Sequence, residues 1–328
     1  MRYVPGLGIV LVIALVAWRL GIVVPVVGGP VFGIVMGMIV QALFHPGQRF
    51  RPGISLSSRQ VLQLAVILLG TGLSLADIAK AGVASLPVMM GTMTCCLLGT
   101  WLFGRLLGVS ADLRAMIGVG TGICGASAVA AVSGVIDATE LDVAYAISTI
   151  FMFNVIAVLT YPTIGHLLHF SQHTFGLWAG TAINDVSSVV AAAYTYGQAA
   201  GNFAVIVKLT RTTLIIPIAL SLAAARVLHL RREGTGSVQI RWAKLIPWFI
   251  FIFVLAALAN SLGVFSSGEL SVLSDLAKFF IIMALTAIGL SARFGEMRHT
   301  GTKPLLLGAI LWATVGLSSL GLQSLGIH

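Results

Sequence analysis

The stretch Gly118-Val-Gly-Thr-Gly-Ile-Cys-Gly-Ala-Ser-Ala-Val-Ala-Ala-Val-Ser-Gly134 decides how this chain folds. It is as apolar as a membrane helix, yet four glycines remove side chains from two turns of its first half. Each glycine costs about 1 kcal/mol relative to alanine in a helix interior. In hydrocarbon, irregular backbone is tolerated only where it is buried in protein or lines a cavity. We therefore predict a helix interrupted at a binding site, the pattern of secondary transporters.

A second stretch repeats this pattern sixty residues later. Gly180-Thr-Ala-Ile-Asn-Asp-Val-Ser-Ser-Val-Val-Ala191 matches Gly120–Ala131 at six of twelve positions. The second copy carries Asn184 and Asp185 in place of Cys124 and Gly125. Because an acidic residue inside an apolar segment is costly and usually functional, Asp185 becomes a candidate site residue.

The composition is that of a membrane protein. Of 328 residues, 58% are hydrophobic and 9% are charged, whereas soluble proteins carry about 25% charged residues. We predict an all-α polytopic membrane protein with about eleven transmembrane helices, forming a single transmembrane transporter domain over residues 1–328. The apolar segments are 4–24, 26–44, 60–76, 84–104, 115–136, 143–163, 175–198, 203–225, 245–263, 273–292 and 304–324.

The net charge of +9 indicates membrane orientation rather than nucleic-acid binding, because Lys and Arg collect in cytoplasmic loops. A cytoplasmic N-terminus puts every strongly basic loop on one side. The predicted inner loops are His45–Arg59, Arg105–Arg114, Arg226–Lys244 and the loop with Arg293, Arg298 and Lys303. The predicted outer loops are Asp137–Asp142 and Gly263–Leu273. The loop with His166, His169 and His173 is also predicted to be cytoplasmic, where solvated histidines are favoured over a metal site.

Another internal similarity favours an inverted repeat. Gly72-Leu-Ser74 matches Gly289-Leu-Ser291 at an offset of 217, and Pro87 and Gly91 match Pro304 and Gly308. By the predicted topology, the fifth apolar segment pairs with the tenth rather than the seventh. The sequence therefore leaves both 178–192 and 281–291 as candidates for the second crossing helix.

Two cations lie deep in one apolar segment. Lys208 and Arg211 are three residues apart and share a helix face, and Arg211 lies about 12 Å along its segment. Arginine presents a planar fork that matches oxyanions. We predict an anion site, with an internal ion pair to Asp185, or snorkelling of Lys208 toward the membrane surface, as the alternatives. The predicted substrate-binding residues are Thr121, Gly122, Cys124, Gly125, Ser127, Lys208 and Arg211, and packing between small residues is the alternative for the break.

The second stretch offers hard oxygen ligands for a coupling ion. We predict that Asn184, Asp185, Ser187 and Ser188 carry Na⁺ or H⁺; a purely structural carboxylate is the alternative. An interhelical hydrogen bond is favoured for Asn154. The chain has no Walker motif and no soluble domain, so we expect neither an enzyme nor a cofactor or resident metal. Expected partners are membrane lipid and a small anion, without nucleic acid, and the chain is compatible with a homodimer.

Several motifs resemble the YeiH-type family of bacterial inner-membrane proteins, which are often called sulfate exporters. The resemblance rests on Gly118–Gly134, Phe175–Ala193, Val207–Pro217, and Met283–Ser291 with Gly301-Thr-Lys-Pro304. Asn184 departs from the histidine that is common before the aspartate in that family. The resemblance implies inverted repeats and two broken helices that cross at mid-membrane, as in Na⁺/H⁺ antiporters and bile-acid symporters.

These observations predict a secondary active transporter of a small anion, such as sulfate or another oxyanion or organic anion, coupled to H⁺ or Na⁺. A monovalent cation/proton antiporter would use Asp185 as its carrier. A channel or a non-transporting membrane protein are further alternatives, and the broken helices with buried charge argue against the last.

Overall fold

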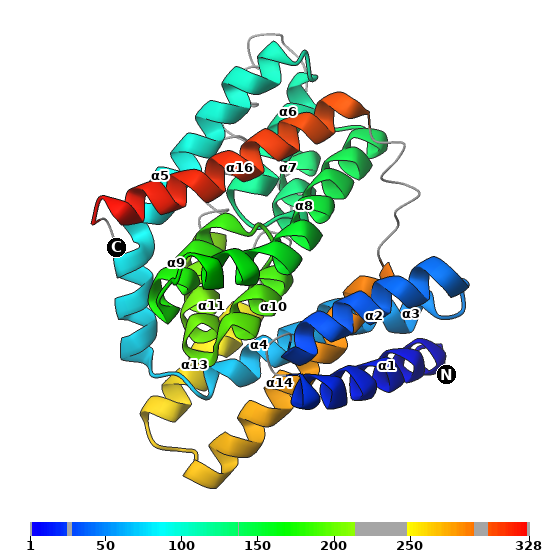
Figure 1. Cartoon of the computed structure of the whole chain (residues 1–328), viewed down its shortest axis with the longest axis vertical. Coiled ribbons are helices and arrows are strands. Elements are labelled where there is room, and N and C mark those ends of the chain that lie inside the picture. Colours follow the sequence, from blue (N-terminus) through cyan, green and yellow to red (C-terminus); the bar gives the residue numbers. More distant parts are fainter. Residues whose placement is uncertain (1, 25–27, 137, 214–247, 292–300, 327–328) are drawn as a thin grey trace.

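The computed structural model describes residues 2–24, 28–136, 138–213, 248–291 and 301–326, and no strand occurs among them (Figure 1). Six of the described helices are long and apolar enough to cross a membrane. The prediction of an all-α polytopic membrane protein is confirmed. The helices are α1 (Val4–Val23), α2 (Gly28–Phe44), α3 (Arg51–Leu56), a π-helical turn (Ser57–Val61), α4 (Leu62–Gly70), α5 (Leu75–Leu106), α6 (Ala111–Gly122), α7 (Ala126–Ile136), α8 (Glu140–Leu167), α9 (Gln172–Ala182), α10 (Val186–Tyr196), α11 (Gln198–Thr213), α13 (Trp248–Ser261), α14 (Ser267–Ser291) and α16 (Thr302–Ser324).

Two glycines hold α2 and α14 in close contact. A β-carbon at Gly37 would lie 2.4 Å from the Thr286 carbonyl oxygen, and one at Gly289 would lie 2.2 Å from the Ile34 carbonyl oxygen. Side chains are therefore excluded on both sides of this crossing, as is usual where membrane helices approach closely. The helix α14 is continuous over Ser267–Ser291. It is thus not the second broken helix, which leaves 178–192.

The long helices connect two ends of the molecule, which we call the basic end and the opposite end. The basic end lies near the starts of α1, α3, α6 and α16, and it holds Arg49, Arg51, Arg105, Arg114 and Lys303. The opposite end holds the turns at 71–74, 168–171 and 262–266. The helices α1, α2, α5, α8, α14 and α16 and the continuous run α3–α4 extend between these ends (Figure 1).

The pair α6–α7 forms a hairpin that enters from the basic end and returns to it. Helix α6 runs antiparallel to α5, because Gly104 lies against Arg114 and Gly118 against Thr100. Helix α16 is also antiparallel to α5, because Gly99 lies against Leu311 and Gly91 against Leu322. Helix α8 is parallel to α16, because Gly308 lies against Thr149 and Gly316 against Tyr161. Since α6 and α8 run in the same direction, α7 must run back.

The pair α9–α10 forms a second hairpin from the opposite end. The rings of Phe175 and Tyr196 stack at 3.8 Å between centroids. Gln172, at the start of α9, donates to the Tyr196 carbonyl oxygen and accepts from the Ala200 N–H. The start of α9 therefore lies beside the end of α10. Ser171 caps α9 by accepting a hydrogen bond from the Thr174 N–H at 3.1 Å.

These two hairpins correct the predicted crossing helices. The helices are interrupted where expected, but neither pair passes from one end to the other. The hairpins enter from opposite ends with only α8 between them, so the similarity at an offset of 60 relates two inverted elements. This also explains why the fifth and seventh apolar segments resemble each other: each returns to the end from which it enters.

The same geometry corrects two predicted loops. Glu140 and Asp142 lie at the start of α8, on the basic end with Arg114, and not opposite it. His166, His169 and His173 lie at the opposite end, away from the basic loops. The loop Arg226–Lys244 and residues Arg293 and Arg298 lie outside the described residues.

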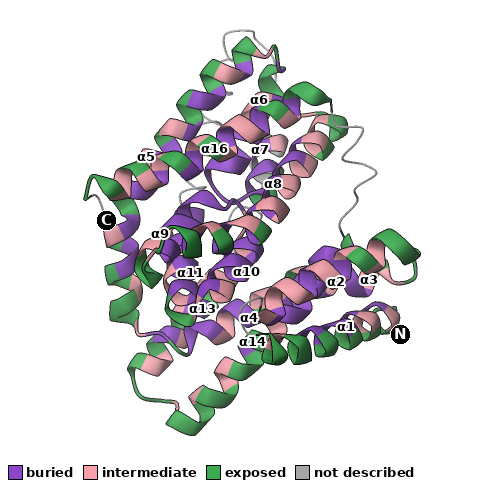
Figure 2. Cartoon of the chain, in the orientation of Figure 1, coloured by how far each residue is buried: buried purple, intermediate pink, exposed green. Residues whose placement is uncertain are grey.

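Burial is concentrated around the hairpins (Figure 2). Every residue of α9 from Phe175 to Ala182 is buried, whereas α1 exposes much of its apolar surface. Irregular backbone in a membrane protein requires this protein cover. The fold thus buries residues 121–125 and 181–184, which include most of both hairpin tips.

Candidate functional site

The tip of the first hairpin is Ile123-Cys124-Gly125. The Gly125 N–H donates to the Gly120 carbonyl oxygen at 2.9 Å, which closes the end of α6. Gly125 has φ +69°, the left-handed conformation that commonly ends a helix and favours glycine. Its carbonyl oxygen then accepts the first hydrogen bonds of α7, from the N–H groups of Ala128 and Val129. Gly125 therefore reverses the chain.

The tip of the second hairpin is Ile183-Asn184-Asp185. Asp185 is the N-cap of α10: its Oδ2 accepts from the Ser187 N–H at 3.0 Å and also from the Ser187 hydroxyl. Asn154, in the middle of α8, accepts from the Asn184 N–H at 3.2 Å. Asn154 thus makes a long-range hydrogen bond, but to the backbone of a hairpin tip rather than, as was predicted, to another helix. The side-chain oxygen Oδ1 of Asn184 is buried, and no described residue donates a hydrogen bond to it.

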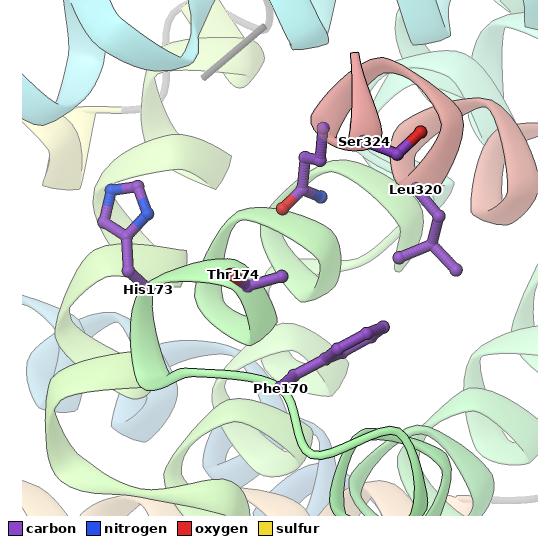
Figure 3. Close-up of a pocket in the computed structure, with 6 residues that line it drawn as sticks. Phe170, His173, Thr174, Leu320 and Ser324 are labelled. Atoms are coloured by element: carbon purple, nitrogen blue, oxygen red, sulfur yellow. The ribbon is translucent and has the colours of Figure 1, made fainter. Parts of the chain in front are cut away.

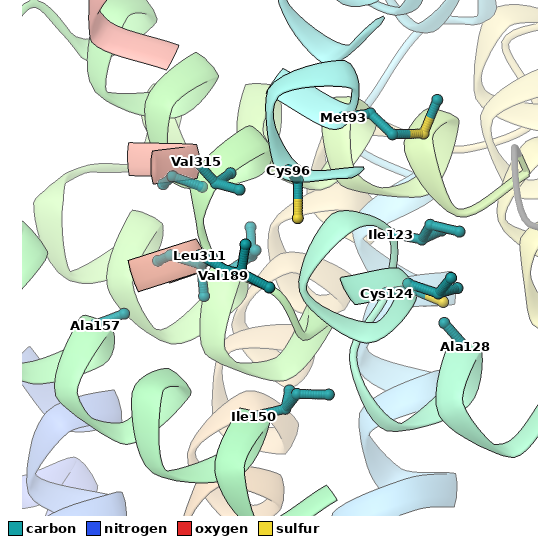
Figure 4. Packing of buried hydrophobic residues seen from close by; sticks show 14 of the residues in the cluster. Met93, Cys96, Ile123, Cys124, Ala128, Ile150, Ala157, Val189, Leu311 and Val315 are labelled. Atoms are coloured by element: carbon teal, nitrogen blue, oxygen red, sulfur yellow. The ribbon is translucent and has the colours of Figure 1, made fainter. Parts of the chain in front are cut away.

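The two tips touch. A β-carbon at Gly125 would lie 3.5 Å from Cβ of Asp185. Figure 4 shows Ile123 and Cys124 of the first tip in the apolar cluster that also holds Cys96, Ile150 and Val189. The tips therefore lie against hydrocarbon, where charges interact more strongly than in water.

Lys208 on α11 joins the two tips. Its Nζ donates to the Ile123 carbonyl oxygen at 2.8 Å and to the Ile183 carbonyl oxygen at 2.9 Å. These carbonyls end α6 and α9, where the helix dipole leaves partial negative charge. Lys208 has no exposed surface. One buried ammonium group thus compensates the ends of two helices.

Arg211 lies one turn further along α11 and also has no exposed surface. Its Nη1 donates to the Thr181 carbonyl oxygen in the last turn of α9. Its Nε and Nη2 are buried and have no acceptor among the residues that the structure describes. In the described part of the chain, Lys278 and Asp275 form an ion pair, while Lys208, Arg211 and Asp185 form none. The alternative of an internal ion pair to Asp185 therefore does not hold in this structure.

A family model described as conserved hypothetical protein 698 matches residues 5–308. The chain belongs to this family. Its relatives carry the name UPF0324 membrane protein. One from Streptococcus pneumoniae serotype 4 is 44% identical, and one from Streptococcus agalactiae serotype V is 40% identical, each over 98% of this chain and 97% of the relative.

A third relative, from Fusobacterium nucleatum, is 40% identical over the same shares of the two chains. These names state a membrane location and no substrate. The resemblance to a family of membrane proteins is therefore confirmed at the level of UPF0324, while sulfate export stays a prediction.

Among the other predicted site residues of this UPF0324 member, Thr121 and Gly122 are buried in the last turn of α6, and Ser187 and Ser188 in the first turn of α10. Ser127 is exposed on the first turn of α7, and Asp185 is half-buried. The structure thus gathers Cys124, Gly125, Asn184, Asp185 and Lys208 at the tips, with Arg211 against α9. The described residues contain no group of three or more His, Cys, Asp or Glu that could hold a metal ion.

The sequence did not identify the residues of α16 that contact the second hairpin. Ser319 is 2.7 Å from Thr181, hydroxyl to hydroxyl, and the Trp178 Nε1–H donates to the Gly316 carbonyl oxygen at 3.1 Å. Both contacts bridge 138 residues of chain. The signal that was available is the pair of small residues Gly316 and Ser319 on one helix face, which is common in membrane helices and so carries little weight alone.

Replacing Gly125 by alanine is expected to destabilise the first hairpin. The left-handed conformation costs a residue with a β-carbon about 1–2 kcal/mol, while the new methyl group meets Asp185 only at ordinary contact distance. Thermal denaturation of the purified protein should show a lower melting temperature for Gly125→Ala. Gly8→Ala is the matched control, because no atom lies near a β-carbon at Gly8 in α1. Equal melting of Gly125→Ala and the wild type would contradict the assignment of Gly125 as the reversing residue.

Proposed function

We propose that this protein is a secondary active transporter of a small oxyanion, coupled to H⁺ or Na⁺ at Asp185, and that it is not an enzyme. The observation that carries the proposal is the unpaired edge of the Arg211 guanidinium. Nε and Nη2 lie on one edge of the planar guanidinium group. From this edge they can donate two parallel hydrogen bonds to two oxygens of one carboxylate or sulfate group. Buried donors without acceptors are rare in proteins and indicate an absent partner.

The charges around the tips favour an anion. Two basic side chains, those of Lys208 and Arg211, are fully buried near one half-buried carboxylate, that of Asp185. Basic groups therefore outnumber acidic groups around the tips. Burying an uncompensated charge is costly, so binding of an anion stabilises this arrangement.

Asp185 is the candidate for coupling. It is half-buried, it has no ion pair within the described residues, and its carboxylate stands at the point where the two tips meet. Protonation or Na⁺ binding there changes the charge beside Lys208 and Arg211. The occupancy of the anion site and the occupancy of Asp185 are then linked, and such linkage is reciprocal.

The two hairpins suggest how access alternates. One enters from each end, and their tips share Lys208, so a small movement of either hairpin opens the site toward its own end. We place the basic end in the cytoplasm of a bacterial cell, at the inner membrane, because arginine and lysine favour that side. The N-terminus is then cytoplasmic.

Labelled-sulfate efflux from proteoliposomes tests the proposal, with and without a pH or Na⁺ gradient. We expect efflux that depends on one gradient and that is lost in Arg211→Gln. Absence of sulfate flux, together with proton flux that depends on Na⁺ or K⁺ and is lost in Asp185→Asn, would contradict the proposal and favour the cation/proton antiporter. Currents above carrier turnover would instead favour a channel.

Asp185→Asn separates coupling from folding. Asparagine caps helices as well as aspartate does, so α10 keeps its N-cap while the carboxylate is lost. We expect sulfate binding to persist and gradient-driven flux to fall at least about tenfold, the effect of losing about 1.4 kcal/mol of coupling free energy. Binding measured by calorimetry and flux measured in proteoliposomes check this. Unchanged gradient dependence would remove Asp185 from the coupling role.

A further inference from the structure

A pocket lies at the opposite end of the molecule, between the start of α9 and the end of α16. Its volume is about 420 Å³, and it is shown in Figure 3. Phe170 and Leu320 form apolar walls, and the remaining lining residues carry hydroxyl, amide or imidazole groups, with no acidic residue among them. The lining residues are Phe170, His173, Thr174, Leu320, Gln323 and Ser324. The pocket is therefore open to an anion without like-charge repulsion.

A line of polar groups leads from this pocket to Arg211. Gln323 Nε2 donates to Ser319 Oγ at 3.3 Å, and Ser319 Oγ lies 2.7 Å from Thr181 Oγ1. Thr181 then accepts, through its carbonyl oxygen, from Arg211 Nη1. Ser319, Thr181 and Arg211 have no exposed surface. The line thus runs from the surface to the buried guanidinium.

Hydroxyl contacts between membrane helices are common packing contacts, so the contact between Ser319 and Thr181 alone proves little. Two features distinguish this line. It begins at a pocket, and it ends at a buried cation whose Nε and Nη2 have no acceptor in the described part of the chain. A packing contact requires neither feature.

We propose that this pocket is the mouth through which an oxyanion reaches Arg211 from the opposite end, passing Gln323, Ser319 and Thr181. The inference rests on the proposed anion site. It adds α16 to the site and assigns Ser319 and Gln323 as residues that contact the passing anion through their hydroxyl and amide groups.

Accessibility to charged thiol reagents tests this route without requiring a transported substrate. Ser319→Cys is made in a background where Cys95, Cys96 and Cys124 are replaced by alanine. Spheroplasts are exposed to the anionic reagent MTSES or the cationic reagent MTSET. Because a cleft of positive potential concentrates anions by about tenfold or more, we expect MTSES to modify Ser319→Cys at least about tenfold faster than MTSET. Adding Arg211→Gln should remove this preference.

Ser85→Cys is the matched control, since Ser85 is equally buried but its hydroxyl bonds within its own helix, to Gly82. It should stay unmodified, and Ser324→Cys at the mouth should react with both reagents. If Ser319→Cys folds poorly, Gln323→Cys replaces it with the same expectation. The route would be overturned if Ser319→Cys is modified no faster than Ser85→Cys. It would also be overturned if the preference of Ser319→Cys for MTSES over MTSET persists in the Arg211→Gln background. If Ser319→Cys reacts preferentially with MTSES but the protein transports no sulfate, sulfate is wrong as the substrate, while the route from the pocket to Arg211 stands.

Discussion

Arg211→Gln is expected to abolish sulfate binding and flux. The unpaired Nε and Nη2 of Arg211 offer two charge-assisted hydrogen bonds, each worth about 1.5–3 kcal/mol. Losing both corresponds to a loss of affinity of about 100-fold or more, since 1.4 kcal/mol is a factor of ten. Isothermal titration calorimetry with sulfate on the purified protein measures this directly.

Arg211→Lys is the matched control for the fork. It keeps the positive charge but presents a point charge in place of two parallel donors. We expect it to bind sulfate more weakly than the wild type and more tightly than Arg211→Gln. All three proteins must elute as single species in size-exclusion chromatography. Wild-type affinity in Arg211→Gln would show that the anion, if it binds, does so elsewhere.

Lys208→Met is expected to separate the two hairpin tips. The substitution keeps an unbranched apolar side chain but removes both hydrogen bonds from Nζ and leaves the carbonyls of Ile123 and Ile183 buried without a donor. Charge-assisted hydrogen bonds contribute about 1.5–3 kcal/mol each, so we expect a loss of about 3 kcal/mol or more. Thermal denaturation should show a melting temperature lower by about 5–10 °C.

Lys278→Met is the control for removing a lysine. Lys278 is paired with Asp275 at 3.1 Å, but both side chains are largely exposed, and such pairs contribute about 0–1 kcal/mol. Its melting temperature should stay close to that of the wild type. If Lys208→Met melts like Lys278→Met, the tips are held together by packing alone.

Much of the site followed from local chemistry. The glycines before Cys124 and the pair Asn184-Asp185 marked the two interruptions, because poor helix formers and a carboxylate in an apolar segment each require a reason. The depth of Arg211 in its segment indicated a buried cation. Each of these properties depends on the residues of one segment alone, so the sequence of that segment is enough to predict it.

The path of the chain through the molecule did not follow from local chemistry. Two half-helices of eleven or twelve residues each have the same apolar length as one broken span, so hydropathy does not separate a crossing helix from a returning hairpin. The left-handed turn at Gly125 and the contact of Gln172 with Tyr196 decide it, and the second is a long-range contact. Each hairpin was predicted to cross the membrane once. Asp142 and His169, which follow and precede the hairpins in the chain, were for that reason assigned to the wrong sides.

The contacts of Lys208 also set an order for assembly during synthesis. Ile123 precedes Lys208 by 85 residues and Ile183 precedes it by 25, so both hairpins leave the ribosome before the group that satisfies their tips. Until α11 enters the bilayer, two carbonyl ends lie in the membrane without a donor. The chain must therefore be extended past Lys208 before the carbonyl groups at either hairpin tip gain their donor.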